Sequence, residues 1–447
     1  MQTLAELSLR LERGQVSARA LVEQALRRIE DPGGEGARVF LSVARDSARR
    51  QAEEIDRQRA AGHAPSPFAG IPVAIKDLFD VTGEVTRAGS RVLSDRPPAS
   101  ADAPAVARLR AAGFVLIGRT NMTEFAYSGL GLNPHYGTPL NPFDRATGRI
   151  PGGSSSGSAV AVTDGMAAVG LGTDTGGSCR IPAAFTGIVG FKPTARRVPT
   201  SGTIPLSHTL DSVGPIARSV QCCATVDAIL RGAEPRVLPD ISLSGMRLLI
   251  PTTLVFDGID AAVARAFEAA ERVLDRAGAS IVRAPVPEFA QIPELNAAGG
   301  IVAAESYAWH RELIERDSGR YDPRVAVRIL KGRALSATAL SEIIDARGRL
   351  VESVDRRMEA CDALLLPTVP IVAPPLSACA LDTEYARLNA LVLRNPSLAN
   401  FLDLCGISLP IHEPGSAPVG LMLLGRRDGD ERLLALARAV ESAVSNA

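Results

Sequence analysis

The chain has 447 residues, 49 basic and 49 acidic side chains, and 46% hydrophobic residues. This composition is typical of a globular protein with a large core and excludes a disordered, fibrous or disulfide-stapled chain. The formal net charge of zero argues against a duplex nucleic-acid binder, which would carry a basic surplus on one face. The six cysteines include no C-x-x-C pair, so we expect free thiols.

The first elements in chain order are helical. Residues 3–11 and 18–29 have helical patterns, the second after Ser17 as an N-cap, and residues 43–61 form a charged run rich in Ala and Arg. We therefore predict a helical N-terminal arm over residues 1–61. The chain start lacks the basic and apolar segments of a signal peptide, so we expect a cytoplasmic protein.

From residue 67 onward, short apolar runs between Gly and Pro alternate with helical patterns. Strands are predicted at residues 73–75, 114–117, 280–283, 363–366, 407–410 and 419–424, and helices at 103–112, 261–277, 341–360 and 430–444. This alternation predicts an α/β sheet covered by helices. The most apolar long stretch, residues 363–378, contains four prolines, so we expect no membrane span.

Lysine is rare among the basic residues. The only lysines are Lys76, Lys192 and Lys331. Genomic base composition explains the preference for arginine, but a buried lysine can lose its proton near neutrality and arginine cannot. Lys76 directly follows the apolar residues 71–75, which predicts an amine buried at a strand end with a lowered pKa. The alternative is an ion pair with Asp77 or Asp80, and Lys331 is expected to be a solvated charge.

Glycine and serine are concentrated in one stretch of the chain. Residues 148–193 contain eleven glycines, and two Gly-Gly-Ser elements stand within residues 152–158 and 172–180. Glycine at this density indicates backbone with positive φ or a close approach to another group. Two such loops near each other in sequence favour a functional site over two ordinary turns.

Three chemistries compete for these loops. A phosphate-binding loop would need Lys followed by Ser or Thr at its end, which neither loop has. A nucleophile elbow matches formally at Ser155, with Asp403 and His412 as downstream partners. The third is a serine hydrolase that uses Lys76 as its base, because a serine hydroxyl needs a neighbouring base to become a nucleophile.

The sequence resembles the amidase signature family along nearly its whole length. The motifs that carry the resemblance are GIPVAIKDLFDV (70–81), TNMTEFA (120–126), PGGSSSGSA (151–159), GTDTGGSCRIPA (172–183), GFKPT (190–194), LDSVGPIARS (210–219), FLDLCGISLP (401–410) and VGLMLLG (419–425). The resemblance implies a single large α/β domain over residues 1–447, with a mixed central sheet covered by helices on both faces. Its catalytic core would span 67–230, and residues 240–447 would supply the rest of the sheet and the pocket helices.

The resemblance also implies roles for individual residues. Lys76 matches the family's general base, Ser154 its bridging serine and Ser178 its acyl-forming nucleophile. The interval of 24 residues between the two serines fits the family and favours Ser154 over Ser155 as the bridge. In the family, a cis peptide bond precedes the bridging serine.

Residues 175–178 form the loop that would carry the nucleophile, and we call it the nucleophile loop. Its backbone N–H groups are expected to hold the oxyanion, because glycine lets the backbone approach the substrate closely. These donors are those of Thr175, Gly176, Gly177 and Ser178. Asp174 and Arg180 are expected to brace the loop.

The implied function is hydrolysis of the C–N bond of a small or medium carboxamide, without cofactor or metal. The alternatives are the glutaminase (A-type) subunit of a tRNA-dependent amidotransferase and, more remotely, an esterase of α/β-hydrolase type that uses Ser155. Candidate pocket residues are Met122, Tyr127 and Ser155, and specificity is expected in residues 122–135 and 303–335. We expect a small-molecule amide as the partner, no nucleic acid or membrane, and a candidate homodimer.

Overall fold

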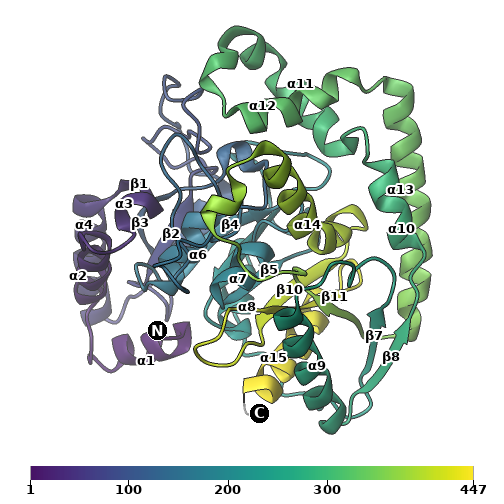
Figure 1. Ribbon diagram of the computed structural model, residues 1–447. Coiled ribbons are helices and arrows are strands. Elements are labelled where there is room, and N and C mark those ends of the chain that lie inside the picture. The colour runs from purple at the N-terminus through teal and green to yellow at the C-terminus, as the bar shows by residue number, and fades with distance from the viewer. Residues whose placement is uncertain (1, 446–447) are drawn as a thin grey trace.

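Between residues 2 and 445, the strands join in one mixed sheet of eleven, in the order β1-β3-β2-β4-β6-β5-β10-β11-β9-β7-β8 (Figure 1). This computed structural model describes residues 2–445. The strands are β1 (Phe40–Val43), β2 (Pro72–Lys76), β3 (Val115–Thr120), β4 (Val169–Asp174), β5 (Val189–Lys192), β6 (Ser212–Ala217), β7 (Arg247–Pro251), β8 (Ser280–Ala284), β9 (Ala363–Pro367), β10 (Cys405–Pro410) and β11 (Gly420–Gly425). Strand β2 is parallel to β3 and β4, and β7 is parallel to β8 and β9, whereas the remaining pairs are antiparallel.

Helices cover both faces of this sheet. They are α1 (Leu4–Glu12), α2 (Ala18–Ile29), α3 (Gly36–Val39), α4 (Arg45–Ala60), α5 (Pro104–Ala111), α6 (Ser156–Thr163), α7 (Arg180–Thr186), α8 (Val220–Leu230), α9 (Ala261–Arg276), α10 (Glu288–Leu295), α11 (Gly300–Asp317), α12 (Pro323–Leu330), α13 (Ala337–Arg357), α14 (Asp382–Phe401) and α15 (Asp430–Ser445). Helices α5, α8, α15 and α9 contact one another along one face, and α6, α7, α14 and α10 along the other. The predicted α/β fold with a mixed sheet covered on both faces is confirmed.

The central strands carry apolar side chains on both faces because helices cover both. Every residue of β2, β4, β6, β9 and β11 is buried. Strand β8, at one edge, has only exposed and half-buried residues. None of the helices within residues 2–445 has the length and apolar character needed to cross a membrane.

The N-terminal region departs from the expected helical arm. Helix α2 begins as predicted, with the Ser17 side chain accepting a hydrogen bond from the backbone N–H of Ala20. Residues 40–43, however, form β1, an edge strand antiparallel to β3. The strand has only four residues, Phe-Leu-Ser-Val, of which only Phe40 is buried, so its apolar run is too short to stand out beside the helical patterns on either side. In Figure 1 this region lies at the left edge, whereas α11, α12 and α13 form the top and right.

Candidate active site

Lys76 and the nucleophile loop meet because of strand direction. Lys76 ends β2, and Asp174 ends the parallel neighbour β4. The carboxyl ends of parallel strands lie at the same edge of a sheet, and the register pairs Ile75 with Leu171. The end of β2 therefore lies beside Thr173 and the loop that follows β4.

The Lys76 amine is fully buried and hydrogen bonded to two hydroxyls. Its Nζ lies 2.8 Å from Ser154 Oγ and 2.8 Å from Thr173 Oγ1. Burial lowers the pKa of Lys76 to about 8, because removal from water disfavours the charged form. The ion-pair alternative is wrong, since the Asp77 carboxylate accepts from Gly89 and Arg119 instead.

Ser154 and Ser155 lie side by side before α6 but differ in their surroundings. The Gly153–Ser154 peptide bond is cis, and Ser154 Oγ accepts from Lys76. Ser155 Oγ instead donates to the carbonyl of Thr173 at 3.4 Å. Within the described residues, no hydrogen bond links Ser155 to Asp403 or His412, and Asp403 pairs with Arg196. The elbow interpretation therefore lacks its acid and its base.

A buried ion pair supports the nucleophile loop. Arg180 donates to Asp174 through two nitrogens, Nη2 at 2.9 Å and Nε at 3.0 Å, and all three side chains of the cluster, including Asn400, are buried. The Asn400 amide donates to the Asp174 carbonyl at 2.9 Å and to its carboxylate at 3.0 Å. Burial alone would raise the pKa of Asp174, but the Arg180 charge and these hydrogen bonds hold it well below its usual range. The bracing role expected for Asp174 and Arg180 is confirmed by these contacts.

The same carboxylate removes one of the four expected oxyanion donors. The N–H of Gly177 donates to Asp174 Oδ1 at 2.8 Å, so it is not free to bind a substrate oxygen. The N–H groups of Thr175, Gly176 and Ser178 have no hydrogen-bond acceptor among residues 2–445. The sequence does not show this division, because it results from the Asp174 side chain turning back onto its own loop.

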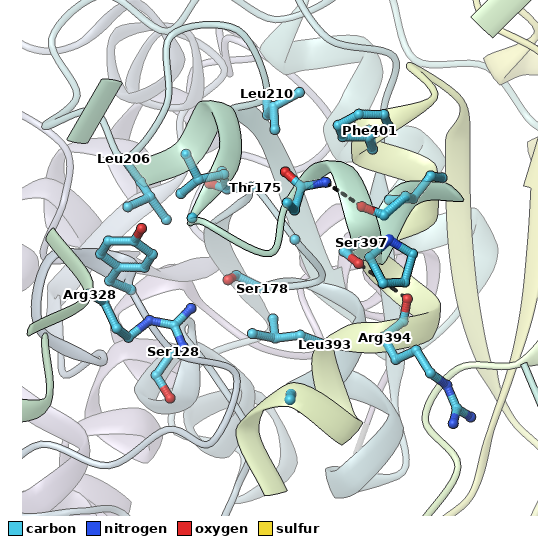
Figure 2. A pocket seen from close by; sticks show the side chains of 18 of the residues that line it. Ser128, Thr175, Ser178, Leu206, Leu210, Arg328, Leu393, Arg394, Ser397 and Phe401 are labelled. Atoms are coloured by element: carbon cyan, nitrogen blue, oxygen red, sulfur yellow. Dashed lines mark hydrogen bonds between the residues drawn. The ribbon is translucent and has the colours of Figure 1, made fainter. Parts of the chain in front are cut away.

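Ser178 lies on the wall of a cavity of about 650 Å³ (Figure 2). Thr175 and Gly176 line the same cavity, so their free N–H groups belong to the segment that a substrate would meet. Only 3% of the Ser178 surface is exposed. In the described part of the chain, no hydrogen bond joins the hydroxyls of Ser178 and Ser154.

Most described residues of the cavity wall are apolar, and the charged side chains among them are all positive. These charged residues are Arg328, Lys331, Arg387 and Arg394. Arg394 donates to backbone carbonyls, and Arg387 pairs with Glu384. Arg328 forms no ion pair within residues 2–445; its Cζ lies 4.6 Å from the centre of the Tyr127 ring, and its buried Nε has no partner.

Of the three candidate pocket residues, the structure places one on the cavity wall. Tyr127 lines the cavity. Met122 is fully buried against Gly89, and Ser155 is fully buried behind the nucleophile loop, beside Gly172. Both belong to tightly packed backbone segments, so the expectation that they face the substrate is not met. Lys331 is exposed, as expected, but it also lines the cavity.

Three residues that contact Lys76, Asp174 or the nucleophile loop have no role in the sequence-based prediction. They are Thr173, Asp211 and Asn400. Asp211 accepts from Thr175 Oγ1 at 2.5 Å and from the backbone N–H of Leu206 at 3.0 Å, and burial raises its pKa to about 6. An alignment of β2 with its parallel neighbour β4 would have indicated Thr173, because it places the end of β4 beside Lys76. Nothing in the local sequence indicates Asn400, which approaches from α14.

The chain is similar to known proteins over nearly its whole length. The Amidase family model matches residues 20–434. A 2-amino-5-chloromuconic acid deaminase from Comamonas testosteroni is 34% identical, over 99% of this chain and 96% of its own length. A glutamyl-tRNA(Gln) amidotransferase subunit from Roseiflexus sp. (strain RS-1) is 34% identical over 98% of this chain and 96% of its own length. A crystal structure of an amidase, 32% identical, superposes with a TM-score of 0.89 and covers 99% of both chains. The chain therefore belongs to the amidase family, whose signature motifs it carries.

Proposed function

We propose that this chain hydrolyses a carboxamide through an acyl-enzyme on Ser178, with Ser154 as the bridging group and Lys76 as the base. The observation that carries the proposal is the buried Lys76 amine, 2.8 Å from Ser154 Oγ, beside the loop that presents Ser178 to the cavity. A neutral amine at this position can accept a proton, and burial favours the neutral form.

The reaction follows from these positions. Lys76 takes the proton of Ser154 as Ser154 takes that of Ser178, and the Ser178 oxygen bonds to the amide carbon. The relay requires the Ser178 hydroxyl to turn toward Ser154 when substrate binds. The carbonyl oxygen then carries the negative charge, and the free N–H groups of Thr175, Gly176 and Ser178 are the donors available to it.

The second half of the reaction returns the proton. The C–N bond breaks as the leaving nitrogen receives a proton back through Ser154, which releases ammonia or an amine. A water molecule then gives a proton to the relay and attacks the acyl carbon. The ester bond to Ser178 breaks as the serine oxygen takes this proton back from the relay, and a carboxylic acid leaves the cavity.

We further propose that the amide substrate carries a carboxylate. Every charged side chain among the described residues of the wall is basic, and Arg328 offers a guanidinium without a counter-ion. A planar guanidinium binds a carboxylate through two parallel hydrogen bonds. The related deaminase from Comamonas testosteroni is named for a substrate that is itself an acid.

A matched pair of amides tests the substrate class. We expect succinamate to be hydrolysed with a higher kcat/KM than butyramide, and Arg328→Gln to lower kcat/KM for succinamate by about 10- to 100-fold, the range of a lost charge-assisted hydrogen bond. Butyramide should change less than about threefold, because it makes no such bond. Arg387→Gln is the control, since Arg387 already has Glu384 as a partner. An equal loss on both amides would contradict a carboxylate contact.

The rate should follow the protonation of Lys76. With a pKa of about 8, the amine is mostly charged below this pH, so kcat/KM for succinamate should rise about tenfold per pH unit up to pH 8 and level off above it. The value of kcat/KM falls toward acid pH because only the deprotonated Lys76 amine can act as the base. A pH series with circular dichroism at each end checks this, and a flat profile from pH 6 to 9 would exclude Lys76 as the base.

Ammonia release by the purified chain tests the function as a whole. We expect release from carboxamides without any other protein, measured over a panel that includes succinamate, butyramide and glutamine. If only glutamine were hydrolysed, and only after partner proteins were added, a role within a tRNA-dependent amidotransferase would replace this proposal.

A further inference from the structure

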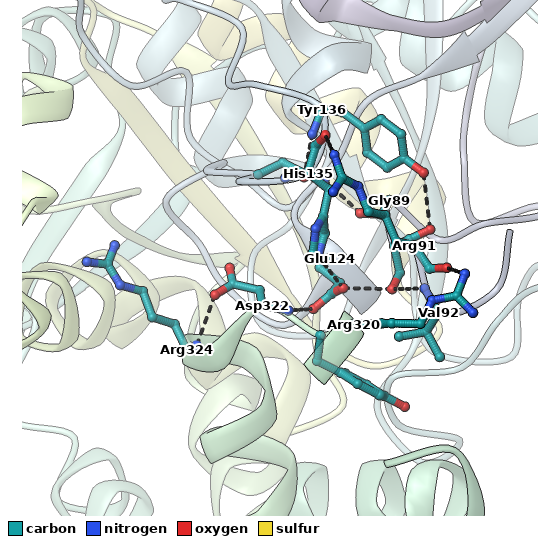
Figure 3. Close-up of polar contacts among 12 residues, drawn as sticks. Gly89, Arg91, Val92, Glu124, His135, Tyr136, Arg320, Asp322 and Arg324 are labelled. Carbon is teal, nitrogen blue, oxygen red and sulfur yellow. Dashed lines mark hydrogen bonds and ion pairs between the residues drawn. The ribbon is translucent and has the colours of Figure 1, made fainter. Parts of the chain in front are cut away.

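Glu124 lies at the centre of a polar cluster beside the cavity (Figure 3). Its carboxylate is fully buried. Oε1 lies 2.6 Å from Ser90 Oγ and 2.8 Å from His135 Nε2, and Oε2 accepts from the backbone N–H of Asp322 at 2.7 Å. With the His135 proton on Nε2, the contacts give the carboxylate three donors, which are Ser90, His135 and the backbone of Asp322.

The Asp322 contact places this carboxylate at the start of α12. Asp322 is the N-cap of that helix, and its side chain accepts from the backbone N–H of Arg324 at 2.9 Å. Next to the bond, the rings of Phe125 and Tyr321 pack with their centres 5.4 Å apart. The segment around Glu124 and the two residues that precede α12, Tyr321 and Asp322, are therefore joined by a hydrogen bond and an aromatic contact.

Both sides of this junction continue into the cavity wall. Tyr127 follows Glu124 by three residues, and its backbone N–H donates to the Glu124 carbonyl at 3.1 Å. Arg328 follows Asp322 by six residues along α12. Their side chains meet at the wall, where the guanidinium lies 4.6 Å from the ring centre.

We propose that Glu124 is a positioning residue for substrate selection. By holding the start of α12 against its own segment, it sets where the Arg328 guanidinium stands over Tyr127, and so governs how an acidic amide binds. It does not touch the reacting atoms. This inference rests on the carboxylate-bearing substrate proposed above.

The backbone N–H of Thr123, next to Glu124, donates to the carbonyl of Ser154, so a substitution of Glu124 could also move Ser154. The decisive variant is therefore made at Asp322. Asp322 has φ −60° and ψ 120°, and Tyr321 before it has ψ 154°, which are values that a proline at 322 accepts. Asp322→Pro and Asp322→Ala both lose the side-chain cap. Only the proline variant also loses the backbone N–H at residue 322 that donates to Glu124.

We expect Asp322→Pro to raise KM for succinamate about tenfold above that of Asp322→Ala, with kcat changed less than about threefold and butyramide unaffected. The KM of Glu124→Gln for succinamate should stay close to that of the wild type. Its amide oxygen can still accept from Asp322, and its NH₂ can donate to Ser90 Oγ and to His135 in its other tautomer. Equal KM values for the two Asp322 variants, or a parallel fall in kcat on both amides, would overturn the proposal.

Hydrogen exchange of α12 separates this inference from the proposed function. Peptides that cover residues 323–330 should exchange faster in Asp322→Pro than in Asp322→Ala, whether or not the chain hydrolyses any amide. Faster exchange with no turnover by the wild type would reject the function and keep the positioning contact between Glu124 and Asp322. Identical exchange in the two variants would reject that contact as the support of α12, whatever the activity.

Discussion

Ser178→Ala is expected to lower amide turnover by on the order of 10⁴-fold or more, because the other hydroxyl on the loop, that of Thr175, donates to Asp211 and lies outside the proposed relay. The side chain is 3% exposed and loses a single oxygen, so the fold should be retained. Hydrolysis of succinamate and mass spectrometry of the acyl-enzyme measure the two consequences: loss of rate and loss of the covalent adduct.

Ser155→Ala is the matched control for that experiment. Ser155 is also buried, but its hydroxyl donates only to the Thr173 carbonyl, away from the cavity. We expect activity within about tenfold of the wild type, the cost of one neutral hydrogen bond. A dead Ser155 variant beside an active Ser178 variant would restore the elbow interpretation.

Lys76→Arg is expected to be nearly as damaging as Lys76→Met, with both losing on the order of 10³-fold or more. The guanidinium stays charged in proteins, so it cannot accept the proton of Ser154, whereas methionine fills the space without any base. Retention of the positive charge would thus bring no rescue. This outcome distinguishes a proton acceptor from a residue that only supplies charge.

Chemical rescue provides the complementary readout. Lys76→Ala leaves room beside Ser154, and added methylamine should restore part of the rate in proportion to its unprotonated form. A Lys76→Arg enzyme with more than about a tenth of the wild-type rate would show that the base lies elsewhere.

Local sequence patterns indicate the buried amine and the glycine-rich loops, whereas the choice of Ser154 and Ser178 comes from the resemblance to the amidase signature family. An apolar strand that ends in lysine predicts a buried amine, and the structure buries Lys76 completely. The Gly-Gly-Ser elements predict backbone that another group can approach closely, and among residues 2–445 the N–H groups of Thr175, Gly176 and Ser178 find no acceptor. These features depend on residues that are neighbours in the chain, which is why sequence could indicate them.

The rest depends on contacts between distant segments. The cavity wall combines Tyr127 with Arg328 and Arg394 from two later helices, and no local pattern tells which faces of those helices meet. Gly177 was expected to be a free donor, but a side chain three residues earlier occupies it. Strand β1 is not predicted because it has only four residues at a sheet edge, of which only Phe40 is buried.

The contact between Asn400 and Asp174 has a consequence for how the site is assembled during synthesis. The two residues are separated by 226 positions, yet the amide of one bonds the carboxylate and carbonyl of the other. A growing chain holds Lys76, Ser154 and Ser178 long before Asn400 leaves the ribosome. The Asp174 support of the nucleophile loop therefore obtains its full set of hydrogen bonds only after residue 400 has been made, and a fragment that ends before α14 carries these three side chains without the Asn400 contact to Asp174.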